Sequence, residues 1–138
     1  MTRRVIRLSE TALVVRDHDE ALAFYVGVLG FELVEDTELP GKRWVRIRAG
    51  GAGLVLRKAT TEEQLARVGN QTGGSVLLFI ETDDFTATHA RLVAQGVRFV
   101  EAPRHEPFGT VAVCLDLYGN KIDLIEPRGR NSVEDRRE

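Results

Sequence analysis

The stretch DHDEALAFYVGVLGFELVE, residues 17–35, recurs in altered form as DDFTATHARLVAQGVRFVE at residues 83–101. In both copies thirteen steps separate the first Asp from a Gly, and an apolar segment precedes the Asp. An Asp followed by apolar residues at spacings of three and four indicates a helix start, and the Gly indicates the helix end. Each copy therefore predicts a strand, a helix and another strand, with helices at residues 18–29 and 84–95.

Two more strands are predicted after each copy. RWVRIRAGGAGLVLRK at 43–58 and TVAVCLDLYGNKIDLIE at 110–126 both hold two apolar segments around a Gly-containing turn. The chain is thus predicted to be α+β, with the order strand, helix, strand, strand, strand occurring twice. We expect one domain of two modules, residues 7–58 and 76–127, with a connector at 59–75 and a flexible tail at 128–138.

Composition excludes several classes of function. The chain has 138 residues, of which 43% are hydrophobic, which is enough for a real core. A net charge of −2 supplies no basic field for nucleic acid, and no segment approaches the roughly 20 apolar residues of a membrane span. Cys114 is the single cysteine, so it has no partner for an intramolecular disulfide. We expect a cytoplasmic protein with neither a nucleic-acid nor a membrane partner.

Asp123 is an unusual residue for its position. In DLYGNKIDLIEP, residues 116–127, it stands between Ile122 and Leu124 in a predicted strand. Asp is disfavoured in strands, and an unpaired charge that faces a packed core costs several kcal/mol. Asp123 is therefore expected to face water, a partner or a ligand.

The doubled pattern, together with ALAFYVGVLGFEL at 21–33 and DLYGNKIDLIEP, resembles the vicinal oxygen chelate superfamily. This superfamily includes glyoxalase I, the bleomycin-resistance proteins and the extradiol dioxygenases, and the resemblance covers roughly residues 7–127. It implies a glyoxalase-like fold of two βαβββ modules, with curled mixed sheets that enclose a cavity and helices on the convex faces. It also implies a homodimer, because such sheets leave edges that a partner covers. It does not imply one reaction.

The resemblance assigns four positions to metal ligands, on the first and last strands of each module. In this sequence they are occupied by Glu10, Val55, Leu77 and Asp123. Zinc, nickel and iron sites use three or four N, O or S donors, and Val55 and Leu77 offer none. We therefore predict no cofactor and no transition metal. A magnesium or manganese ion held by Glu10, Asp123 and water stays open.

Strand alternation suggests further ligand contacts. Val45 and Ile47 suit a helix-covered face, which places Trp44, Arg46 and Arg48 on the cavity face. An arginine there would pair with a carboxylate or, with Trp44, bind a planar or anionic organic ligand. The alternatives are that the arginines lie on an exposed strand end and that Trp44 packs in the core or a dimer interface.

Three more residues complete the candidate site. Val55 and Leu77 would line the cavity, and His105, in a predicted loop EAPRHEPFG, would touch ligand at its mouth. His18 and His89 lie at helix positions where a structural role is expected.

Three functions follow from these residues. The first is a bleomycin-resistance-like protein that binds a small molecule without a metal. The second is a lyase, isomerase or epimerase with Glu10 or Asp123 as general base beside an atypical metal. The third is a structural or regulatory dimer with a vestigial cavity. Dioxygenase chemistry ranks last because a two-His, one-carboxylate iron site is missing, and whether the chain is an enzyme stays open.

Overall fold

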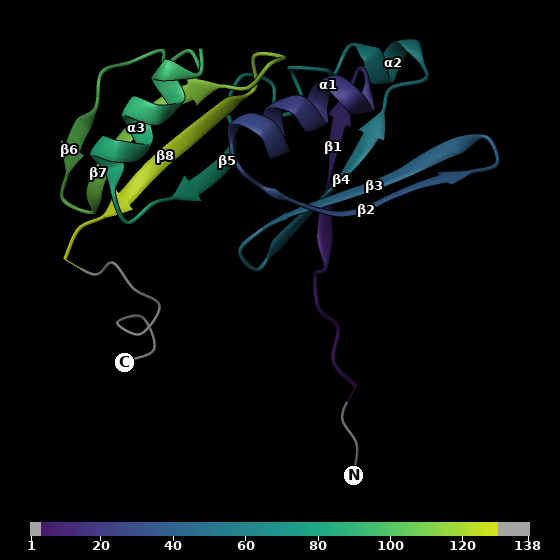
Figure 1. The fold of residues 1–138 in the computed structure, drawn as a ribbon, viewed down its shortest axis with the longest axis horizontal. Helices are drawn as coiled ribbons and strands as arrows, with labels where there is room; N and C mark the ends of the chain where they lie inside the picture. Colours follow the sequence, from purple (N-terminus) through teal and green to yellow (C-terminus); the bar gives the residue numbers. More distant parts are fainter. Residues whose placement is uncertain (1–3, 130–138) are drawn as a thin grey trace. The chain divides into compact units, whose positions relative to one another are not determined.

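Two four-stranded mixed sheets, each with its own helix, make up the fold (Figure 1). The structure is a computed structural model and describes residues 4–129. The chain divides into two compact units, the first ending at Val68 and the second beginning at Gly69. The tail predicted at residues 128–138 lies outside the described residues from residue 130 onward.

The first unit contains one complete βαβββ pattern. Its elements are β1 (Glu10–Val15), α1 (His18–Leu22), η1 (Ala23–Val28), β2 (Glu32–Leu39), β3 (Lys42–Ala49), β4 (Ala52–Lys58) and α2 (Glu62–Leu65). The strand order is β1-β4-β3-β2, with β1 parallel to β4 and the other pairs antiparallel. The order of elements and the mixed sheet agree with the sequence prediction.

The second unit repeats the pattern. Its elements are β5 (Val76–Glu81), α3 (Phe85–Ala94), β6 (Arg104–Glu106), β7 (Gly109–Leu115) and β8 (Lys121–Pro127). The strand order is β5-β8-β7-β6, and β5 runs parallel to β8. The prediction of a loop at residues 101–109 was wrong in part, because residues 104–106 form the edge strand β6.

Asp side chains begin both predicted helices. Asp17 Oδ2 accepts a hydrogen bond from the Glu20 backbone N–H at 2.9 Å, and Asp84 Oδ1 accepts one from Ala87 at 3.1 Å. The first helix widens to a π-helix after Leu22, where the Leu29 N–H donates to the Phe24 carbonyl. Both helices therefore lie where the sequence predicted them.

Strand alternation separates a core face from a second face in each sheet. In the first unit, Val45 and Ile47 are fully buried, as is Tyr25 of η1. In the second unit, Ile122 and Leu124 are buried with Leu92 of α3. Burial of each such side chain contributes about 1.5–3 kcal/mol to folding. Trp44, Arg46 and Asp123 are strand neighbours of these buried residues, so their side chains lie on the opposite faces of the two sheets.

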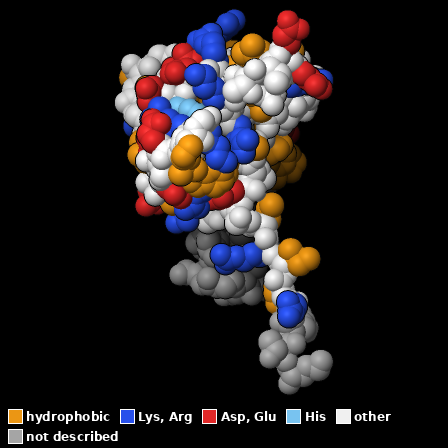
Figure 2. Space-filling view, turned by 90° about the vertical axis from the view of Figure 1, so that its right-hand side faces the viewer, with side chains coloured by type: hydrophobic (Ala, Val, Ile, Leu, Met, Phe, Trp, Pro, Cys, Tyr) orange, Lys and Arg blue, Asp and Glu red, His pale blue; other side chains and the backbone are white. Residues whose placement is uncertain are grey.

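Charged side chains of both signs are interspersed on the surface seen in Figure 2. This distribution agrees with the near-balanced composition of 19 Lys and Arg against 21 Asp and Glu. No helix among residues 4–129 is long and apolar enough to cross a membrane.

Gly69 is required by a close backbone approach within the second unit. Its φ is +78°, and a Cβ built there would lie 2.1 Å from the Tyr118 carbonyl oxygen. Gly73 also has a positive φ, of +68°, but a Cβ there would meet no atom within 4 Å. The two glycines therefore share a backbone restriction and differ in the space around them.

We predict that Gly69→Ala lowers the free energy of unfolding by about 1–3 kcal/mol more than Gly73→Ala does, because only the first forces backbone to move. Chemical denaturation of both variants beside the wild type measures the difference. If both variants lose the same free energy of unfolding, the close approach of residue 69 to the Tyr118 carbonyl does not affect stability.

Candidate functional site

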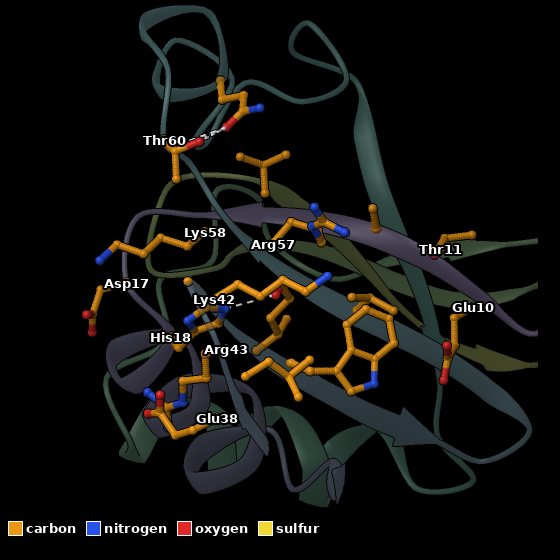
Figure 3. Close-up of a pocket in the computed structure, with 18 of the residues that line it drawn as sticks. Glu10, Thr11, Asp17, His18, Glu38, Lys42, Arg43, Arg57, Lys58 and Thr60 are labelled. Carbon is orange, nitrogen blue, oxygen red and sulfur yellow. Dashed lines mark hydrogen bonds between the residues drawn. The ribbon is translucent and has the colours of Figure 1, made fainter. Parts of the chain in front are cut away.

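A groove of about 1150 Å³ lies over the first unit (Figure 3). Its walls come from β1, β3, β4, the β2–β3 turn and the residues that follow β4. Three of the residues proposed from sequence line it, namely Glu10, Trp44 and Val55. All of its lining residues belong to the first unit.

The sheet register places these side chains on one face. Ala12 on β1 pairs with Val55 on β4, Val55 pairs with Arg46 on β3, and Arg46 pairs with Glu35 on β2. Residues paired across neighbouring strands present their side chains on the same face. The row from Ala12 to Glu35 therefore crosses the sheet on the face opposite Val45 and the core.

Arg46 is the centre of a charged network on this face. Its Nη1 pairs with Glu10 Oε2, and its Nε donates to Glu35 Oε1 at 3.0 Å. The indole Nε1 of Trp44 donates to the same Glu35 oxygen at 3.1 Å. The hydrogen bond from Arg46 is the main reason that the pKa of Glu35 lies below its ordinary value. Trp44 is thus oriented by a carboxylate that sequence reasoning missed.

Two carboxylates occupy the Arg46 guanidinium. The hydrogen bonds that Arg46 donates to Glu10, the larger cause, and to Glu35 raise the pKa of Arg46. Arg46 therefore orients Glu10, Glu35 and Trp44 and has little capacity left for an anionic ligand. Arg48 lies in an exposed position on the same strand and does not line the groove.

Gly53 leaves room for the Glu10 side chain. The two residues pair across β1 and β4, and a Cβ at Gly53 would lie 2.8 Å from Glu10 Cγ. Glu10 can therefore lie across the sheet toward Arg46 because the intervening strand has no side chain at this point.

Basic residues that sequence reasoning did not single out also line the groove: Lys42, Arg57 and Lys58. Arg57 could have been predicted from the alternation of side chains in the β4 segment GLVLRK, because Arg57 lies two residues after Val55 and therefore on the same face. The structure shows no ion pair between any of these three cations and another residue of the 4–129 range.

His18 has a structural position at the edge of the groove. It is 6% exposed, and its Nε2 lies 3.0 Å from the Leu56 carbonyl oxygen. The contact joins the start of α1 to β4, in keeping with the structural role expected for this residue.

Asp123 lies on the second face of the other sheet. It pairs with Phe79 on β5 and Val113 on β7, while its neighbours Ile122 and Leu124 are buried on the core face. Its Oδ1 is buried and has no hydrogen-bond partner within the part of the chain that the structure describes. Burial raises the pKa of Asp123, while the positive charge of Arg104 opposes this shift.

The two remaining candidates also belong to the second unit. Leu77 lies on β5 at a register shift between Val76 and Leu78, and it is half-buried. His105 is exposed on β6, where its Nδ1 lies 3.2 Å from Thr110 Oγ1.

The donor set does not fit a transition metal. Glu10 is held by Arg46, and Val55 and Leu77 have no donor atoms. Within residues 4–129 no three His, Cys, Asp or Glu side chains are grouped so that they could hold a metal ion. Glu10 and Asp123 belong to different units, so the structure gives no joint geometry for them.

Residues 7–124 match the family model of the Glyoxalase/Bleomycin resistance protein/Dioxygenase superfamily. The chain belongs to this superfamily. An uncharacterized protein of Shewanella frigidimarina (strain NCIMB 400) is 47% identical over 127 residues, which is 88% of this chain and 94% of that protein.

Solved structures resemble the chain as well. UcmS2 is 32% identical with a TM-score of 0.76, and the match covers 88% of this chain and 98% of UcmS2. TnmS3, described as an antibiotic binding protein from Streptomyces sp. CB03234, is 29% identical with a TM-score of 0.71 over 91% of this chain and 99% of TnmS3.

In this superfamily member, Asp123→Asn is predicted to stabilise the fold in a pH-dependent way. Because burial raises the folded pKa above the ordinary 3.8, the folded state binds more protons, and wild-type stability falls as pH rises through that window. The variant should gain on the order of 1 kcal/mol at pH 7, and the gain should shrink below pH 3.8.

Denaturation of both proteins across this pH range measures the effect. Asp83→Asn is the matched control, because Asp83 is exposed in the same unit. A gain that does not change with pH would contradict the assignment of Asp123 as a buried, unpaired carboxyl.

Proposed function

We propose that the chain binds a small organic molecule in the groove of the first unit and needs no transition metal to do so. The observation that carries this proposal is the orientation of Trp44 in the groove by its hydrogen bond to Glu35. An oriented indole offers a flat apolar surface at low entropic cost, which suits an aromatic ligand. The enclosed cavity expected from the family resemblance remains part of this proposal.

The size and composition of the groove support binding. Its volume of about 1150 Å³ is slightly above the range for small-molecule sites, which is roughly 300–1000 Å³, so a drug-sized ligand would fit. Apolar side chains such as Val14, Val55 and Leu39 line it beside Trp44. TnmS3, an antibiotic-binding protein, has a similar fold and 29% identity, which favours an antibiotic-like ligand.

A catalytic function has one observation in its favour. The Oδ1 of Asp123 is buried and has no hydrogen-bond partner among the described residues, and burial raises the pKa of Asp123, as in many general acids and bases. Glu10, the other candidate base, is instead held in an ion pair with Arg46.

Incubating a bound compound in D₂O distinguishes a binding function from a catalytic function. A binding protein returns the compound unchanged, whereas an isomerase or epimerase exchanges the hydrogen beside its carbonyl group.

We also propose that the protein is a homodimer. The strands at the edges of the two sheets are β1, β2, β5 and β6, and exposed apolar side chains such as Leu39 and Phe79 lie on them. Unprotected edges favour association. Light scattering at micromolar concentration should give twice the 15.4 kDa chain mass, and a monomer would contradict this proposal.

We predict that Val55→Phe weakens ligand binding at least about tenfold, because the larger side chain fills the groove beside Trp44. Val93→Phe is the matched control, since Val93 is 50% exposed on α3 of the second unit. Thermal shift and Trp44 fluorescence would be recorded with bleomycin and a panel of polycyclic aromatic antibiotics. Treatment with EDTA should leave affinity unchanged.

Two results would contradict the binding function. One is binding that Val55→Phe leaves untouched, which would place the ligand elsewhere. The other is the absence of any binding with a correctly folded protein, which would favour the structural or regulatory dimer.

A further inference from the structure

We infer that the groove selects organic anions: a flat apolar body beside Trp44 with a carboxylate or sulfonate held by Arg57 and Lys42. This inference rests on the proposed binding function and names its ligand class. It depends on which charged groups of the groove are already paired within the protein.

The acidic residues that line the groove are mostly occupied. Glu10 is paired with Arg46, and Asp17 accepts the Glu20 backbone N–H at 2.9 Å as the cap of α1. Glu38, the third, is exposed on β2. As a helix cap Asp17 keeps its negative charge, so two lining carboxylates, Asp17 and Glu38, oppose an anion.

The basic residues that line the groove are mostly available. Arg43 is held by Asp36 at 2.8 Å and by Asp19 at 3.0 Å. Lys42, Arg57 and Lys58 form no ion pair with any residue between 4 and 129. These three cations outnumber the carboxylates of Asp17 and Glu38, which leaves one more positive than negative charge among these five lining groups.

The positions of two of these cations suit an aromatic anion. Val45 pairs with Leu56 at the end of the β3–β4 register, and Trp44 and Arg57 are the next residues of the two strands, both in the lining of the groove. Lys42 lies two residues before Trp44 on β3, on the same face. In Figure 3 Arg57 and Lys42 lie in the middle of the groove, with Lys58 nearer one edge. The planar fork of an arginine binds both oxygens of a carboxylate or sulfonate, and a neighbouring ammonium adds charge.

Two dyes with the same ring system provide the test. 8-Anilinonaphthalene-1-sulfonate carries a sulfonate, whereas N-phenyl-1-naphthylamine is its neutral counterpart. Trp44 is the only tryptophan of the chain, so energy transfer from it to either dye reports binding at the groove. The sulfonate dye should bind at least about tenfold more tightly, and raising the ionic strength should weaken only its binding.

Charge-removing variants identify the cations. Arg57→Gln should weaken binding of the sulfonate dye about five- to tenfold and change that of the neutral dye less than about twofold. Lys42→Gln should act in the same direction and serves if Arg57→Gln does not fold. Arg67→Gln is the matched control, because Arg67 is exposed in the first unit and does not line the groove.

The outcomes separate this inference from the proposed function. If both dyes bind equally and neither variant discriminates between them, the groove binds ligands without selecting anions, and the inference is wrong. If neither dye accepts energy from Trp44, the proposed binding function fails as well. Selective loss of the sulfonate dye in Arg57→Gln or Lys42→Gln supports both.

Discussion

The Arg46 guanidinium joins three strands of the first sheet and fixes the chemistry of its open face. It extends from β3 to Glu10 on the edge strand β1 and to Glu35 on the opposite edge strand β2. These pairs are partly exposed, so their contribution to stability is modest. Their larger effect is on position, because Glu35 in turn orients Trp44 and Glu10 lies over Gly53.

The same network decides which groups of the groove are free to act. Arg46 is occupied by carboxylates, and so is Arg43, which leaves Lys42, Arg57 and Lys58 as the lining cations without an ion pair among residues 4–129. The two carboxylates emphasised by the family resemblance also differ. Glu10 is held in an ion pair, whereas one oxygen of Asp123 accepts no hydrogen bond from residues 4–129.

Sequence reasoning predicted the fold well because both of its signals are local and repeated. Asp caps and apolar spacing located the helices, and alternation along β3 placed Val45 and Ile47 in the core and Trp44 and Arg46 opposite them. The partner of Trp44 could not be predicted in the same way. A register shift between Leu33 and Glu35 brings Glu35 opposite Arg46, and such a shift depends on pairing between strands.

The candidate site was predicted less completely for a related reason. The family resemblance directs attention to the metal-ligand positions, and Arg57, two residues beyond Val55, is not one of them. His105 was expected in the loop EAPRHEPFG, yet a three-residue edge strand fits between Pro103 and Pro107. Which arginine is free and which is paired depends on the folded arrangement of carboxylates, and spacing along the chain does not reveal it.

The separation of the two faces of each strand also bears on how such proteins change over evolutionary time. Residues such as Val45 and Leu56 determine whether the unit folds, while Trp44, Val55 and Arg57 lie on the other side of the same backbone. Substitutions at the latter positions therefore change the lining of the groove while leaving the core packing intact. Gly53 is the exception, since any side chain there displaces Glu10 and with it the Arg46 network. A lineage that keeps this glycine can remodel the lining of the groove by a few mutations without disturbing the core.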